Sequence, residues 1–166
     1  PVMIPRDHVL AGVHGAYNAV FVEAANAGSL MFYGQGAGGH PTASAVLGDL
    51  VSAARAIALG AQGIPLDAYA ALPAVSMDDA TTRLSITVAV TDRLGALAQL
   101  AQVFADHGVS ISTMLQIEDP DAPGMSQLRL VTHSGRHASL MATVAALREL
   151  DVVRDIVSVT PVEAGE

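Results

Sequence analysis

The sequence contains no cysteine and no lysine. The first absence excludes disulfides, thiolate metal sites and thiol nucleophiles within this chain. The second excludes Schiff-base chemistry and acid–base catalysis by lysine. All eight basic residues are arginines, they form no cluster, and the formal net charge is -8. We therefore expect no nucleic-acid partner, because nucleic acids require cations gathered on one face.

Long apolar runs and targeting segments are also missing. No uninterrupted apolar run approaches the length needed to cross a bilayer, so we expect no membrane partner. The start shows neither a signal peptide nor an amphipathic presequence, which leads us to expect a cytoplasmic protein. With 51% hydrophobic residues and a mean hydropathy of +0.44, the 166 residues can build a core in one ordinary domain or two small ones.

The first sixty residues predict a hairpin followed by a helix. Two strands, "AYNAVFVEA" (16–24) and "SLMFYG" (29–34), are joined by a turn at 26–28. Apolar residues then recur at helical spacing over 42–59, with Pro41 at a tolerated entry position and Gly60 as a natural stop. Residues 61–82 carry prolines, small residues and an acidic pair without sustained periodicity, and we interpret them as a linker.

The remainder predicts a second unit. "RLSITVAV" (83–90) alternates as a half-buried strand, and the helix after "TDRLG" carries an apolar stripe that ends at Gly108. Further strands are expected at 109–118, 126–132 and 155–162, with a helix at 137–150. The order β-α-β-β-α-β over 84–162 predicts an α+β, ferredoxin-like fold, in which both helices cover one face of a four-stranded antiparallel sheet.

The stretch "YGQGAGGHPTAS" (33–44) packs four glycines into a turn before a helix. Gly34, Gly36 and Gly39 match the G-x-G-x-x-G pattern, so the helix N-terminus could receive an anion. A dinucleotide fingerprint, however, belongs to a first βαβ unit and needs an acid about 20 residues later, where this chain has Leu59. Two readings stay open: a plain glycine turn, or backbone that approaches a cofactor bound mainly by another domain.

Other polar groups predict no catalytic or metal site. His133 and His137 mark a helix entry rather than one helix face, and Glu118, Asp119 and Asp121 lack the spacing of a calcium loop, which favours a solvated turn. No nucleophile elbow supports a catalytic triad.

The turn "TDRLGAL" (91–97) is more informative. Thr91 or Asp92 could cap the following helix, while Gly95 could let backbone amides approach the carboxylate of a small ligand. The alternative is simply a capped helix start.

Two stretches resemble a known family. "LMFYGQGAGGHPTASAVLGDLVSAAR" (30–55) is similar to the closing segment of the homoserine dehydrogenase catalytic region, and "LSITVAVTDRLGALAQLAQVFADHGVSISTMLQIE" (84–118) resembles the ACT domain that follows it in many bacterial versions. "IPRDHVLAGVHGAYNAVFVE" (4–23) extends the resemblance. It implies a closing segment of the catalytic domain over 1–60, a linker over 61–82 and an ACT domain over 83–166.

For the first segment, the resemblance implies that Gly36, Gly38, Gly39 and Thr42 lie near the nicotinamide end of NAD(P), with Pro41 to Ala45 starting the helix beside it. The family's dinucleotide fold and catalytic lysine have no counterpart here. We therefore expect this chain alone to bind no cofactor and to be inactive, and a further possibility is that its first sixty residues are unfolded without their partners.

For the ACT domain, the resemblance implies an amino acid effector, threonine by analogy with the pathway product, bound between two copies in a homodimer or larger assembly. Leu94 replaces a proline common in this turn. An independent sensor that complements a separate catalytic chain is the alternative. The expected effector-binding residues are Asp92, Arg93, Leu94, Gly95, Ala96 and Leu97 from one copy, and Ser110, Ile111, Ser112, Thr113 and Met114 from the other.

Overall fold

The computed structural model describes residues 1–61, 72–118 and 124–163. The chain divides into two units. One comprises Arg6–Pro73, and the other combines Pro1–Pro5 with Ala74–Glu166. Residues 62–71 of the predicted linker, and the acids Asp119 and Asp121, lie outside the described residues.

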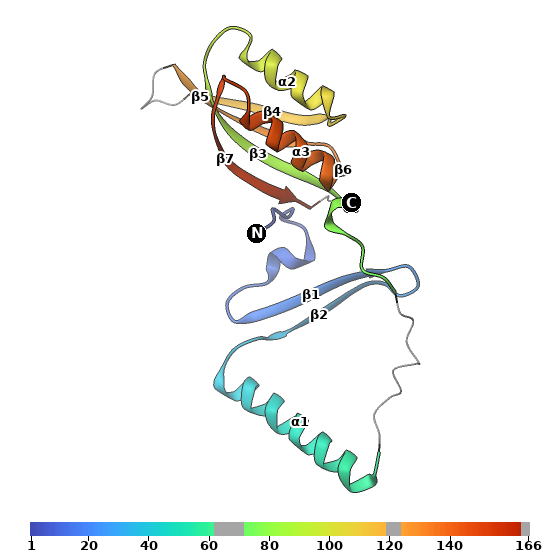
Figure 1. Ribbon diagram of the computed structural model, residues 1–166. Helices are drawn as coiled ribbons and strands as arrows, with labels where there is room; N and C mark the ends of the chain where they lie inside the picture. Colours follow the sequence, from blue (N-terminus) through green and yellow to red (C-terminus); the bar gives the residue numbers. More distant parts are fainter. Residues whose placement is uncertain (62–71, 119–123, 164–166) are drawn as a thin grey trace. The chain divides into compact units, whose positions relative to one another are not determined.

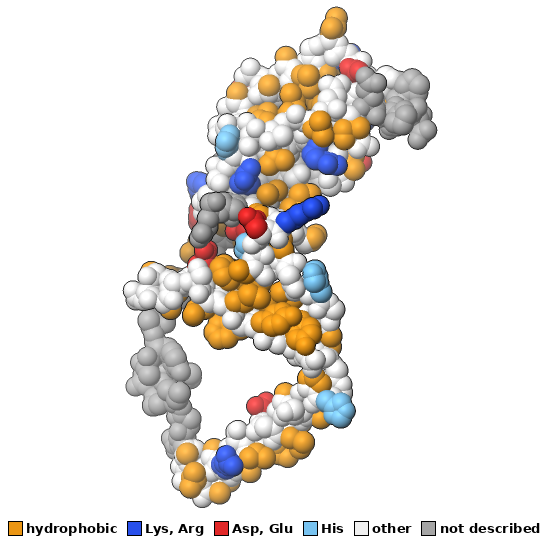
Figure 2. Space-filling model, turned by 180° about the vertical axis from the view of Figure 1, so that it is seen from behind, with side chains coloured by type: hydrophobic (Ala, Val, Ile, Leu, Met, Phe, Trp, Pro, Cys, Tyr) orange, Lys and Arg blue, Asp and Glu red, His pale blue; other side chains and the backbone are white. Residues whose placement is uncertain are grey.

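The unit Arg6–Pro73 contains a hairpin and a long helix (Figure 1). After the short 3-10 helix η1 (Val9–Gly12), strands β1 (Tyr17–Ala24) and β2 (Gly28–Gln35) pair antiparallel along their whole length. Gly28 adopts φ 69° where the chain reverses, a conformation that glycine reaches without a Cβ clash. The predicted hairpin is present. Hydrophobic side chains gather over it in Figure 2, and Phe32 is 64% exposed.

Helix α1 (Gly39–Leu59) starts three residues before the predicted helix and ends at Gly60, which takes the left-handed conformation at φ 60°. None of its residues is buried within the chain. With a hydropathy of 1.4, α1 is by length and composition alone sufficient to cross a membrane. The helix contains no unbroken apolar run of that length, in line with the sequence analysis, and its average hydropathy is raised by alanines placed between polar and small residues.

The second unit has the predicted order of helices and strands. Its sheet runs in the order β4-β5-β3-β7, all antiparallel, and the two-residue strand β6 also pairs with the start of β3. The strand β3 begins at Thr81, earlier than predicted, just after the 3-10 helix η3 (Met77–Asp79). The elements are β3 (Thr81–Thr91), α2 (Ala96–Asp106), β4 (Ile111–Glu118), β5 (Met125–Thr132), β6 (Gly135–Arg136), α3 (His137–Arg148) and β7 (Val153–Val162).

Apolar residues at every second position of β3 build the core, as the period-two pattern predicts. Ser85 and Thr87, on the opposite face, are only 3% and 9% exposed, so the prediction of a half-buried strand is wrong for the centre of β3. Its even-numbered residues from Leu84 to Val90 are at most 2% exposed and face the apolar stripes of α2 and α3, which cover one face of the sheet (Figure 1). Phe104 from α2 and Leu147 from α3 are buried at the centre. Gly108 follows α2 at φ 67° and lets the chain turn back into β4.

The first residues of the chain join the same unit, which the sequence did not indicate. Met3 forms a parallel bridge with Val162, near the end of β7. Its N–H donates to the carbonyl of Pro161 at 2.8 Å, and its carbonyl accepts from the N–H of Glu163 at 2.8 Å. The outer edge of β7 is thus partly paired.

Candidate functional site

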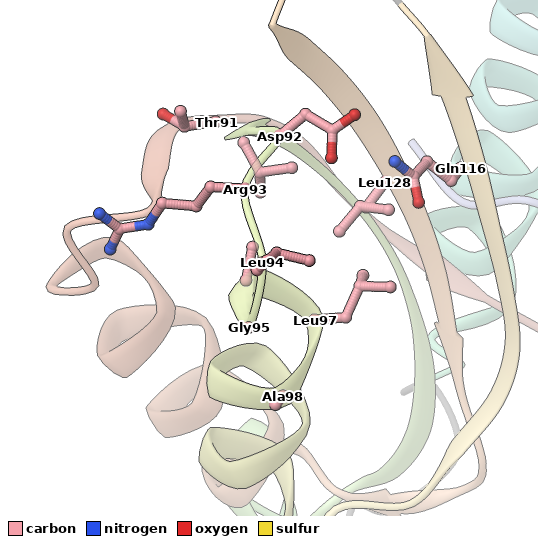
Figure 3. A pocket seen from close by; sticks show the side chains of 11 residues that line it. Thr91, Asp92, Arg93, Leu94, Gly95, Leu97, Ala98, Gln116 and Leu128 are labelled. Atoms are coloured by element: carbon pink, nitrogen blue, oxygen red, sulfur yellow. The ribbon is translucent and has the colours of Figure 1, made fainter.

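The turn between β3 and α2 forms one wall of an open pocket of about 680 Å³ (Figure 3). The other wall comes from β4 and β5, through Gln116 and Leu128. All six residues predicted for this half of the site, Asp92 to Leu97, line the pocket together with Val90, Thr91 and Ala98.

Gly95 shapes this turn. It is the N-cap of α2 and adopts φ 84°, which a residue with a Cβ reaches only at a cost. No side chain caps the helix, so the prediction that Thr91 or Asp92 does so is wrong. Thr91 instead accepts a hydrogen bond from Nε of Arg154 at 3.0 Å, and the N–H of Asp92 donates to the carbonyl of Gly124 at 2.9 Å. Because glycine replaces a capping side chain, the first amides of α2 stay uncovered.

These amides give the pocket an anion-binding wall. The N–H groups of Leu97 and Ala98 have no partner among the described residues, and they lie at the positive end of the helix dipole. A ligand carboxylate could accept hydrogen bonds from both.

Asp92 and Gln116 supply the polar groups opposite the amides. In Figure 3 their side chains point toward one another across the pocket mouth, above Leu97 and Leu128. The amide of Gln116 donates to the hydroxyl of Ser126 at 3.1 Å, which fixes its orientation and leaves its carbonyl oxygen able to accept. A carboxylate and an amide at one end, and free N–H groups at the other, suit an ammonium and a carboxylate on one small molecule.

Sequence reasoning missed Gln116, because it lies 24 residues after Asp92 and only sheet pairing brings the two strands together. Arg93, in contrast, points away from the pocket in Figure 3. Its guanidinium pairs with Asp151 at 2.7 Å.

The other predicted half of the site lies along β4. Ser110 precedes the strand, its carbonyl accepts from the N–H of His133 at 2.8 Å, and Ile111 packs on the core. Ser112, Thr113 and Met114 are exposed on this edge strand. None of the five lines the pocket of their own chain. Their assignment to a second copy stays a prediction.

Contacts and backbone conformation within the chain explain two glycines of the turn before α1, Gly36 and Gly38. The side chain of Asn18, on β1, occupies the position that a Cβ on Gly36 would take. Gly38 is the N-cap of α1 with φ 130°, and its carbonyl accepts from Thr42 N–H at 3.1 Å. A Cβ on Gly39 would meet nothing within 4 Å, so this side of the turn is open. Such bare backbone fits the close approach of a cofactor.

The structure places His133 and His137 at the entry to α3, as their spacing predicts. His137 begins α3, and His133 lies in the preceding loop. Across residues 1–61, 72–118 and 124–163, no three His, Cys, Asp or Glu side chains gather in a way that could hold a metal ion.

Two family models match the chain. The homoserine dehydrogenase model matches residues 1–51, and the ACT domain model matches residues 84–152. Homoserine dehydrogenases of Mycobacterium tuberculosis and Corynebacterium glutamicum are 47% and 46% identical over 98% of this chain. This chain corresponds to the C-terminal part of homoserine dehydrogenases, the end of the catalytic region followed by an ACT domain.

Solved structures agree with this assignment. A homoserine dehydrogenase from Thiobacillus denitrificans matches 98% of the chain with a TM-score of 0.82 and 31% sequence identity. A second, from S. aureus, matches with a TM-score of 0.51 at 22% identity and supports the fold alone.

The chain spans 36% to 38% of the length of these relatives. The relatives therefore contain a large region with no counterpart here. The first family match includes residues 39–51 of α1, where Val46, Leu47, Leu50 and Val51 are exposed in this chain.

Proposed function

We propose that this chain is the regulatory C-terminal part of a homoserine dehydrogenase, and that its ACT unit binds a free amino acid at the turn between β3 and α2. The supporting observation is the pocket itself, which combines unpaired helix amides with Asp92 and Gln116. The amides of Leu97 and Ala98 receive the ligand carboxylate, and Asp92 receives its ammonium. Gln116 and Asp92 accept from a hydroxyl on the ligand side chain, which favours threonine.

The ligand's affinity can be measured directly by titration calorimetry of this chain. We expect heat with threonine, and roughly 10-fold to 100-fold weaker binding for Asp92→Ala, because the charge-assisted bond to the ammonium is lost. Gln116→Ala should lower the affinity for threonine more than that for alanine. Gln102→Ala is the matched control, since Gln102 pairs with Asp106 on α2 and does not line the pocket.

Absence of heat with every amino acid tested, from a chain whose circular dichroism shows the folded sheet, would contradict the proposal. Equal losses for Gln116→Ala and Gln102→Ala would contradict the role given to Gln116.

The first unit is proposed to form one wall of the NAD(P) site in the complete enzyme. The open side of Gly39 supports it, because a Cβ there would meet nothing within 4 Å and the backbone is uncovered at the start of α1. Gly36, Gly38, Gly39 and Thr42 would border the nicotinamide, which supplies or accepts the hydride that interconverts aspartate semialdehyde and homoserine. This chain alone, lacking the dinucleotide fold and lysine, is proposed to be inactive.

Regulation would then couple the amino acid site of the ACT unit to the NAD(P) site of the complete enzyme. Effector binding at the turn would favour one arrangement of subunits, which the linker passes to α1. The exposed edge of β4, with Ser112 to Met114, would pair with the same edge of a second copy and bring those residues near its pocket. In the complete enzyme, threonine should lower the rate of homoserine oxidation, and Gly95→Asp should reduce that inhibition because it adds charge at the carboxylate site. Identical inhibition curves for wild type and Gly95→Asp would contradict the coupling.

A further inference from the structure

The turn between β3 and α2 is tied to the turn between α3 and β7, residues 149–152. The N–H of Thr91 donates to the carbonyl of Val152 at 2.9 Å, and Val152 is 0% exposed. The hydroxyl of Thr91 accepts a hydrogen bond from Nε of Arg154, the second residue of β7, at 3.0 Å. Thr91 is therefore held by its main chain and by its side chain, at the point where β3 ends and the pocket wall begins.

The direction of successive side chains links this tie to the pocket. Along an extended chain, neighbouring side chains point to opposite sides. In Figure 3, Thr91 and Arg93 extend away from the pocket, whereas Asp92, between them, points into its mouth. Arg93 is itself tied to the turn between α3 and β7, because its guanidinium pairs with Asp151 at 2.7 Å. Both neighbours of Asp92 are thus fastened on the far side, which limits the directions that its carboxylate can take.

The two ties differ in how strongly solvent weakens them. The side chains of the Arg93–Asp151 pair are 47% and 71% exposed, so water and salt screen their attraction. Thr91 is half-buried and its hydroxyl is neutral, so salt weakens its bond to Arg154 less. Arg154 is therefore the better candidate for holding the turn in place.

Arg154 has little to contribute to folding. Its side chain is exposed, and among the described residues it forms no salt bridge. Ligand binding is more sensitive to it, because a carboxylate that is already held in its binding direction loses less conformational freedom when a ligand arrives. A contact of this kind changes affinity more than it changes the stability of the sheet.

We propose that Arg154 is a positioning residue of the amino acid site: through the hydroxyl of Thr91 it keeps Asp92 directed at the ammonium of the ligand. This inference rests on the proposed function, which gives Asp92 that role. Arg154 does not line the pocket, so its influence passes through Thr91.

Substitutions of matched length test the bond. Arg154→Met keeps the length of the side chain and removes the donor, whereas Arg154→Gln places an amide N–H at the position of Nε and removes only the charge. In calorimetry with threonine, Arg154→Met should bind about 3-fold to 10-fold more weakly than wild type, and Arg154→Gln should stay within about 2-fold of it. Arg148→Met is the matched control, because Arg148 is exposed on α3 and does not line the pocket.

Two results would overturn the proposal at this stage. One is wild-type affinity for threonine in Arg154→Met. The other is an equal loss in Arg154→Met and Arg154→Gln, because the charge and not the hydrogen bond would then be responsible. Thr91→Val removes the acceptor at nearly constant shape and should reproduce the loss seen in Arg154→Met, so it carries the same test if the latter variant does not fold.

A double-variant cycle separates positioning from a general effect on the fold. In the Asp92→Ala background, Arg154→Met should cause no further loss of affinity, because no carboxylate is left to position. Amide NMR titration with threonine measures the weak binding of these variants. A loss of the same size in both backgrounds would overturn the proposal, since Arg154 would then act on the site without Asp92.

The same titrations distinguish this inference from the proposed function. Absence of threonine heat in the wild-type chain would overturn both. Threonine heat in the wild-type chain that is weakened by Asp92→Ala but not by Arg154→Met or Thr91→Val would overturn the positioning role of Arg154 alone.

Discussion

Thr132 offers a sharp test of how the ACT sheet is held together. Its hydroxyl accepts a hydrogen bond from the N–H of Leu84 at 3.0 Å, and the residue is 0% exposed. The position is special because the pairing of β3 changes there. Ser85 pairs with Val131 on β5, whereas Thr82 pairs with Gly135 on β6. The side chain of Thr132 thus satisfies a backbone group between the two ladders.

Thr132→Val preserves shape but removes the acceptor. A buried N–H left without a partner costs about 1–3 kcal/mol, and the added methyl recovers less than about 1 kcal/mol. We therefore expect a net loss of about 1–2 kcal/mol in the free energy of unfolding of the ACT unit. Thr132→Ser keeps the hydroxyl and loses one buried methyl, which also costs about 1 kcal/mol. Global stability alone does not separate the two variants.

Amide hydrogen exchange does separate them. In Thr132→Val, the Leu84 amide should exchange about 5-fold to 30-fold faster than expected from the change in global stability, because its own bond is lost. In Thr132→Ser, Leu84 should follow its neighbours in β3. A Leu84 amide that is equally protected in both variants would refute the reasoning.

Three further outcomes follow from packing and backbone geometry. Phe104→Ala, at a side chain 1% exposed, should lower the free energy of unfolding by about 3–5 kcal/mol in urea titrations, and a loss below 1 kcal/mol would contradict its central place. Gly38→Ala should cost about 1–2 kcal/mol because of φ 130°, as measured by the thermal stability of α1, whereas Gly39→Ala should be neutral or stabilising. Arg93→Ala should change stability by less than about 1 kcal/mol, because its ion pair with Asp151 is 47% and 71% exposed, and that change should vanish at 1 M salt.

Local sequence rules were sufficient for the longer strands and helices of both units, but not for the short elements η1, η3 and β6. Alternation from Leu84 to Val90 predicted β3, and the apolar stripe ending at Phe104 predicted α2, because one buried face imposes the period of its own secondary structure. The hairpin of β1 and β2 was predicted from the turn residues at 26–28. The family assignment also came from sequence, through the glycine-rich stretch at 33–44 and the second unit, and the family matches agree with it.

Features that join distant residues were decided only by tertiary structure. Gln116 faces Asp92 because β5 lies between β4 and β3, and no local pattern carries that order. The N-cap of α2 is Gly95, in a left-handed conformation, and not Asp92. The N–H of Asp92 instead donates to the carbonyl of Gly124, in the loop before β5. Likewise, Met3 pairs with Val162 at the end of β7, although the two residues lie near opposite ends of the sequence. Periodicity reports which face of an element is buried, whereas pairing, register and long-range hydrogen bonds depend on how the elements assemble.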